Sequence, residues 1–168
     1  MLAFILILIG ILLRLAPHAP NFTPVAAIAL FSGAYLNKKY ALFIPLILMV
    51  ISDLIIGLHN VAIFTWGSFI LITFLGPWLK KRKNALGIVS MSLFSSLLFF
   101  IVSNFGVWLM GWYPHTLAGF INCYVMAVPF LRNFTLSTLI YTTVFISAYE
   151  LVARLVKDTK FAKVLLTN

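Results

Sequence analysis

Long apolar stretches separated by short polar turns are the feature that most constrains this chain. Hydrophobic residues make up 63% of the 168 residues, and charged residues only 9%. Soluble domains carry about 25% charged residues, so water cannot solvate most of this surface. Several stretches reach roughly 18 apolar residues, the length that a helix needs to cross a bilayer. They are continuous and lack the roughly ten-residue alternation of a membrane β-barrel. The sequence therefore predicts a helical protein that crosses a membrane several times.

The apolar stretches predict an all-α, polytopic membrane helix bundle that forms a single transmembrane domain over residues 1–168. We expect six transmembrane helices, at residues 2–16, 24–36, 41–58, 61–79, 85–110 and 131–156. Residues 118–130 are too few for a full span, and Pro129 is expected to end any helix there. We therefore expect this segment to be a short re-entrant or interfacial helix on the outer side. The first stretch lacks a basic leading segment and carries Arg14, so we expect a retained helix rather than a signal peptide.

Basic residues at the ends of the predicted spans set the expected orientation. The positive-inside rule places the basic clusters in the cytoplasm. These are Lys38 and Lys39, residues 80–83, and the lysines after residue 156. The remaining loops then face outward, at residues 17–23, 57–60 and 111–115. The expected protein is a multi-pass protein of the inner (plasma) membrane with both termini in the cytoplasm. Its net charge of +9 does not indicate nucleic acid binding, because the basic residues lie where helices meet lipid headgroups.

Polar and ionisable residues near the outer side predict an outward-facing pocket for a small-molecule ligand. The expected ligand-binding residues are Arg14, His18, Asn21, Asp53, His59, Trp66, Asn104, His115 and Arg132. Ionisable groups inside a membrane are candidates for function. Arg14 and Asp53 are expected to form an ion pair, which either contacts a polar ligand or only holds the spans together. One hypothesis is that the ligand carries an anionic or polar group. Such a group would be attracted by Arg14, by Arg132 and by the positive end of the helix that starts at Pro24.

Catalytic and metal-binding patterns are missing from the sequence. The three histidines do not form an HxxxH or HExxH spacing, and no GxSxG motif is present. Cys123 is the only cysteine, so neither an intrachain disulfide nor a CxxC site can form. We expect no enzyme activity, no cofactor and no metal site. A membrane-embedded enzyme with Asp53, His18 or His115 as acid–base groups is the least favoured alternative.

Two further patterns concern contacts between helices. Ala26, Ala29 and Gly33 recur on one face of the second predicted helix. Such a small-residue face permits close helix packing within the bundle, or it forms a docking face for a partner membrane protein. Glu150 and Arg154 are four residues apart and are expected to pair along one helical face.

Several sequence blocks resemble an uncharacterised family of small bacterial integral membrane proteins. The first block comprises residues 20–34 (PNFTPVAAIALFSGA) and residues 52–57 (SDLIIG). The second comprises residues 113–116 (YPHT), 122–124 (NCY) and 129–130 (PF). That family is in turn similar to the substrate-binding (S) components of energy-coupling-factor transporters. The shared features are six helices, a loop leading into a short helix of small residues, and an acidic residue late in the third span.

The resemblance implies a membrane receptor that captures a vitamin-like molecule on the outer side. Such a receptor docks to a transmembrane coupling subunit that two ATPases drive. The chain has no GxxxxGK[ST] loop, so ATP hydrolysis would have to come from those partners. S components often carry small-residue motifs in their first helix, whereas here the small face is on the second. A structural or assembly membrane protein is the alternative function.

Overall fold

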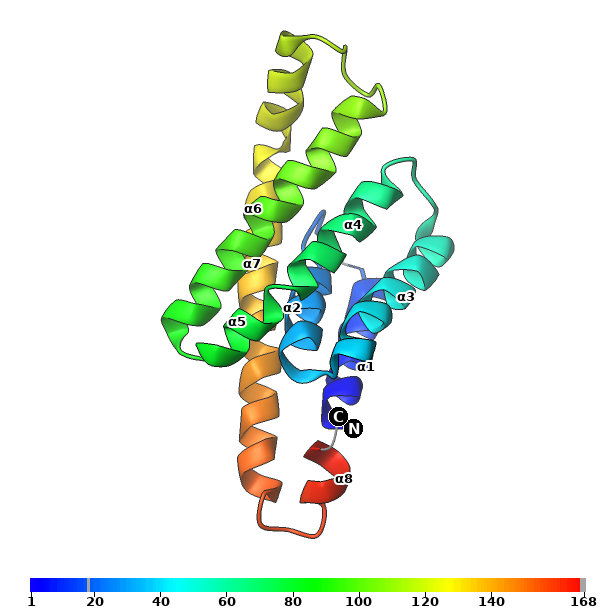
Figure 1. The fold of residues 1–168 in the computed structure, drawn as a ribbon. Helices are drawn as coiled ribbons and strands as arrows, with labels where there is room; N and C mark the ends of the chain where they lie inside the picture. The colour runs from blue at the N-terminus through cyan, green and yellow to red at the C-terminus, as the bar shows by residue number, and fades with distance from the viewer. Residues whose placement is uncertain (18, 167–168) are drawn as a thin grey trace.

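The computed structural model describes residues 1–17 and 19–166, without the side chains of residues 48 and 163. This part of the chain is helical and contains no strand, which confirms the all-α prediction (Figure 1). The helices are α1 (Leu2–Leu15), α2 (Val25–Tyr35), α3 (Lys38–Ile56), α4 (Ala62–Thr73), α5 (Gly76–Lys81), α6 (Ala85–Leu109), α7 (Leu117–Val156) and α8 (Ala162–Leu166).

Four helical segments of the described chain are long and apolar enough to cross a membrane. They are Lys38–Ile56, Ala62–Lys81, Ala85–Leu109 and Leu117–Val156. α1 and α2 are apolar but shorter, with 14 and 11 residues. At a rise of about 1.5 Å per residue they extend roughly 21 Å and 17 Å, less than the thickness of about 30 Å of the hydrocarbon core.

Helix α2 forms the centre of the bundle. All of its residues except Gly33 are buried, and it packs against α1, α3, α4, α5, α6 and α7. A helix that is apolar on every side is expected in such an interior position. A Cβ atom on Gly33 would lie 1.9 Å from the carbonyl oxygen of Thr73, and one on Gly76 would lie 2.3 Å from the carbonyl carbon of Gly33. Small residues therefore allow the backbones of α2 and α5 to touch.

Helix α7 runs without interruption for 40 residues, so the prediction of a separate helix at residues 118–130 is wrong. Pro129 lies inside α7, where its missing N–H removes one backbone hydrogen bond. The buried face of α7 nevertheless continues past the proline, through Cys123, Ala127 and Phe134, and packs on α6. Packing on α6 keeps the parts of α7 before and after Pro129 aligned. Membrane helices tolerate an internal proline where neighbouring helices support them. The α6–α7 hairpin extends beyond the other helices (Figure 1).

The span predicted at residues 61–79 is divided in the structure. α4 ends at Thr73, a turn follows at Phe74 and Leu75, and α5 then continues to Lys81. The spans predicted at residues 2–16, 24–36, 41–58 and 85–110 agree with the observed helices to within a few residues at each end. The span predicted at residues 131–156 ends where α7 ends, but α7 begins 14 residues earlier, at Leu117.

The two ends of the bundle differ in composition. Lys38, Lys39 and residues 80–83 lie at one end, which we call the basic end; the start of α1 and the short helix α8 lie toward this side (Figure 1). The α6–α7 loop, residues 110–116, lies at the other end, which we call the hairpin end.

Candidate functional site

A pocket of about 180 Å³ opens between the loop that precedes α2 and helices α4, α6 and α7. We call it the Asn104 pocket. Its lining side chains are Asn21, Val61, Thr65, Phe99, Phe100, Ser103, Asn104, Val107, Ala127, Phe130, Leu131 and Phe134. Val61 and Thr65 belong to the start of α4, so the pocket lies toward the hairpin end.

Helical spacing places the lining residues of α6 and α7 on facing sides. Phe99, Ser103 and Val107 recur every four residues on α6, so one face of the helix presents them together. The α6 and α7 faces meet in a pair of stacked rings. The ring centroids of Phe99 and Phe134 are 4.2 Å apart with an interplanar angle of 16°. Phe69 of α4 also stacks on Phe99, with ring centroids 5.3 Å apart, but it does not line the pocket. The pocket wall therefore contains the stacked rings of Phe99 and Phe134, which Phe69 supports from α4.

The loop before α2 is held in place by contacts with α7. The side-chain amide of Asn133 donates to the carbonyl of Pro20 at 3.1 Å, and the rings of Phe22 and Tyr141 meet edge to face at 6.0 Å. Asn21 adopts a left-handed backbone conformation with φ 59°, which asparagine tolerates better than most residues. These contacts position Asn21 at the pocket.

The polar groups of the Asn104 pocket are amides and hydroxyls. Asn104 donates to the carbonyl of Phe100 at 2.8 Å, Ser103 to that of Phe99 at 2.6 Å, and Thr65 to that of Ala62 at 2.8 Å. An amide also offers a carbonyl oxygen and a second N–H, and a hydroxyl oxygen can accept. None of the described lining side chains is charged. The pocket suits a neutral ligand that combines an apolar body with a few hydrogen-bonding groups.

Arg14 and Asp53 form an ion pair, as the sequence predicts, within a closed cluster. The Nη2 atom of Arg14 lies 2.5 Å from Oδ1 of Asp53, and its Nε donates to Ser52 at 2.8 Å. The indole N–H of Trp66 donates to Oδ2 of Asp53 at 2.7 Å. Asp53 is only 4% exposed. Both carboxylate oxygens accept a hydrogen bond, and the cluster joins α1, α3 and α4.

The nine predicted ligand-binding residues thus separate into groups. Asn21 and Asn104 line the pocket, whereas Arg14, Asp53 and Trp66 belong to the closed cluster and not to the pocket lining. His59 and Arg132 are exposed. The remaining residues are His115, whose Nε2 lies 3.0 Å from the carbonyl oxygen of Trp108 in the α6–α7 hairpin, and His18, which lies outside the described residues.

The residues considered for partner docking face the chain's own helices. Ala26 and Ala29 are completely buried, and Gly33 lies against Thr73 and Gly76. In this structure their small side chains serve internal packing. A partner would reach them only if the bundle opened.

The aromatic lining was not anticipated from the sequence. Phe99 and Phe134 lie in stretches where nearly every residue is apolar, so no local signal separates them from lipid-facing neighbours. Asn104 stands out because it is polar within such a stretch. No group of three or more His, Cys, Asp or Glu residues suited to a metal ion occurs in the described ranges.

Fold and composition together define a helical bundle with helices long enough to span a membrane. Residues 1–161 match the model of a family of unknown function, DUF6580, and the chain belongs to this family. Neither the curated proteins nor the solved structures contain a significant match.

Proposed function

We propose that this protein is the small-molecule-binding subunit of a membrane transporter and that its ligand binds in the Asn104 pocket. The observation that carries the proposal is the pocket's lining, an aromatic stack with neighbouring amides and hydroxyls. Binding sites for small molecules combine apolar walls with a few placed polar groups. The resemblance to S components of energy-coupling-factor transporters points in the same direction.

The proposed orientation places the basic end in the cytoplasm. Lysine and arginine near span ends favour the cytoplasmic side of the plasma membrane. Counting α1, α2, α3, the α4–α5 segment, α6 and α7 as crossings gives six spans with both termini inside. Asn84 and Asn104 are separated by 20 residues of α6, or about 30 Å. In this orientation the pocket faces the outer leaflet, where it would receive a ligand from outside.

The size and chemistry of the pocket indicate the class of ligand. A volume of about 180 Å³ is below the 300–1,000 Å³ usual for drug-sized ligands. A small planar molecule would stack beside Phe99 and Phe134 and bond to Asn21 and Asn104. A vitamin-like heterocycle has this chemistry. Release of the ligand to the cytoplasm would require partner proteins, namely a transmembrane coupling subunit and ATPases.

A structural or assembly role is the second candidate. Two observations favour it: both carboxylate oxygens of Asp53 are bonded within the bundle, and large apolar side chains of the α6–α7 hairpin are exposed. The exposed side chains include Leu117, Ile121, Val125 and Met126. In that case the hairpin would contact another membrane protein, and the Asn104 pocket would hold no ligand.

Filling the pocket separates the two candidates. Native mass spectrometry of the purified wild-type protein should show a co-purified small molecule, and Ala127→Phe should remove it because the new ring occupies the pocket. Val128→Phe is the matched control, since residue 128 is exposed on the same helix. Asn104→Ala should weaken retention about tenfold through loss of the amide contacts. A ligand-free wild type, or equal retention by Ala127→Phe, would favour the structural role.

A further inference from the structure

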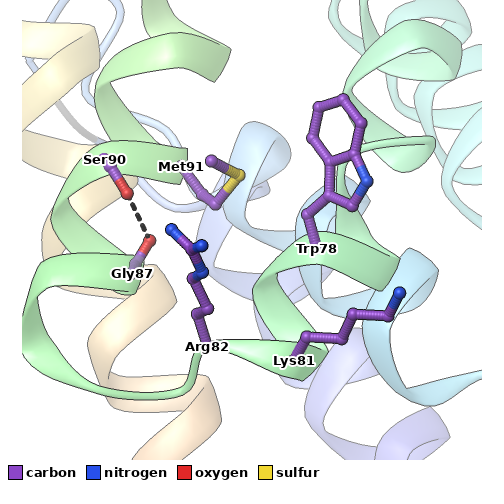
Figure 2. A pocket seen from close by; sticks show the side chains of 6 residues that line it. All are labelled: Trp78, Lys81, Arg82, Gly87, Ser90 and Met91. Carbon is purple, nitrogen blue, oxygen red and sulfur yellow. Dashed lines mark hydrogen bonds between the residues drawn. The ribbon is translucent and has the colours of Figure 1, made fainter.

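A second pocket, of about 400 Å³, lies between α5 and the start of α6 at the basic end. We call it the Arg82 pocket. It is lined by Trp78, Lys81, Arg82, Gly87, Ser90 and Met91. The Arg82 side chain extends into the space between the helices, with Trp78 and Lys81 on the α5 side and Ser90 and Met91 on the α6 side (Figure 2).

The positive charge of this pocket has no ion-pair partner among the described residues. The sequence contains only 3 acidic residues. In the structure Asp53 pairs with Arg14, Glu150 with Lys83 at 2.5 Å, and Asp158 with Lys157 at 3.9 Å. No carboxylate of the described chain lies within 4.0 Å of the Lys81 or Arg82 side-chain nitrogens. Two adjacent cations beside a pocket therefore call for an anion from outside the protein.

The surroundings of the pocket indicate that this anion carries apolar chains. Trp78 is 58% exposed beside the basic residues, the position of an interfacial tryptophan in a membrane protein. Leu86, Leu93 and Phe94 of α6 lie within a few residues of the lining residues in sequence, are exposed, and would face lipid. A free phosphate ester has no apolar chain that could contact these exposed side chains, whereas a phospholipid has.

A third, almost wholly apolar pocket lies farther along α6, between it and α4. It is lined by Ile63, Phe64, Gly67, Ile70, Leu71 and Val102, with a volume of about 470 Å³. Met91 of the Arg82 pocket and Val102 of the apolar pocket are 11 residues apart on α6, or roughly 16 Å. An acyl chain is long enough to reach from one to the other.

We propose that the Arg82 pocket binds the phosphate of an anionic glycerophospholipid. Arg82, whose side chain extends into the pocket, contacts the phosphate, and Lys81, whose amine points away from Arg82, adds positive charge beside it (Figure 2). Trp78 lies at the level of the glycerol, and an acyl chain follows the side of the bundle formed by α4 and α6. Basic pockets between membrane helices on the cytoplasmic side bind such headgroups. The site is separate from the Asn104 pocket and does not depend on the ligand proposed there.

Lipid titration of the full-length, delipidated protein tests this proposal. Native mass spectrometry would compare dioleoylphosphatidylglycerol with dioleoylphosphatidylcholine, which have identical acyl chains. The wild type should retain the anionic lipid at several-fold lower concentration. Lys81→Gln/Arg82→Gln should weaken its binding about ten- to thirtyfold, at roughly 1 kcal/mol per basic residue near the surface, and leave the zwitterionic lipid unchanged. Lys39→Gln/Lys160→Gln removes the same charge elsewhere and should retain the preference.

Three results would overturn the proposal. They are equal binding of both lipids by the wild type, an unchanged preference in Lys81→Gln/Arg82→Gln, and an equal loss in the control variant. Soluble glycerol 3-phosphate provides a further arm: if it displaces the anionic lipid at millimolar concentration, the site binds free phosphate esters instead. Thermal unfolding checks that the variants fold, and Arg82→Lys, which keeps the charge, should retain most of the binding should the double variant prove unstable.

Discussion

At the scale of single residues, the buried charges are defined by their partners. Asp53 has one oxygen bonded to Arg14 and the other to Trp66, so desolvation of the carboxylate is compensated on both sides. Glu150 does not form the ion pair with Arg154 that the four-residue spacing predicts. Its Oε1 accepts from Tyr35 at 2.6 Å and pairs with Lys83, and the described chain contains no Glu150–Arg154 ion pair. Partners distant in sequence make the direct contacts with Glu150, and Arg154 acts on it only through its charge.

The Arg14–Asp53 cluster should be essential for stability. Asp53→Asn leaves the Arg14 charge without its counterion and should lower the free energy of unfolding by about 3 kcal/mol or more. Trp66→Phe removes one hydrogen bond and should cost only about 1 kcal/mol. Thermal unfolding in detergent would measure both. A stable Asp53→Asn variant that has lost ligand binding would show instead that the cluster contacts the ligand.

At the scale of helices, the close crossing of α2 and α5 holds the centre of the bundle together. Gly33 and Gly76 face each other with no room for a side chain on either. The neighbouring positions of α2 are filled by alanines and by Phe31, all fully buried. Interfaces of small residues bring membrane helices into direct van der Waals contact, which contributes to their association.

Adding a single methyl group at this crossing should be costly. Gly33→Ala places a Cβ atom 1.9 Å from the carbonyl oxygen of Thr73, which forces the helices apart and should cost about 1–3 kcal/mol. Gly67→Ala is the matched control, because a Cβ atom there meets nothing within 4 Å. Its effect should lie within about 1 kcal/mol of neutral, with higher helix propensity in its favour. Equal melting temperatures for both variants would contradict the tight crossing.

At the scale of the whole molecule, charge and chemistry are divided between the two ends. The basic end carries the Arg82 pocket, and the Asn104 pocket lies toward the hairpin end. Helix α7 runs from the hairpin end to the basic end (Figure 1). At about 1.5 Å per residue its 40 residues extend roughly 60 Å, about twice the thickness of a hydrocarbon core. Part of α7 must therefore lie outside the core, or the helix must be strongly tilted.

Membrane orientation is testable with single cysteines. In a Cys123→Ser background, Lys81→Cys should react with an impermeant thiol reagent only from the cytoplasmic side, and His115→Cys only from outside. Both positions are exposed, so access is limited by the membrane and not by the fold. Labelling of both from one side of sealed vesicles would refute the orientation and, with it, the outward-facing pocket.

Much of the helix content could be predicted from the sequence, because its causes are local. Runs of apolar residues set where helices form, and the polar turns at Asn37 and residues 82–84 end them within a few residues of the predicted bounds. The polar residues Asn21 and Asn104 were also identified, since an amide in an apolar stretch stands out. The continuity of α7 through Pro129 was not predicted, because it depends on packing against α6.

Composition and periodicity thus sufficed for an apolar helical chain with its basic residues concentrated at one end, since both follow from residue type along short segments. Tertiary packing alone decided which of the many apolar side chains surround a pocket. Phe99 and Phe134 stack because α6 and α7 bring together residues that are 35 positions apart. The partners of Asp53 and Glu150 likewise come from other helices. Contacts of this kind depend on how distant segments fit together, which no local pattern records.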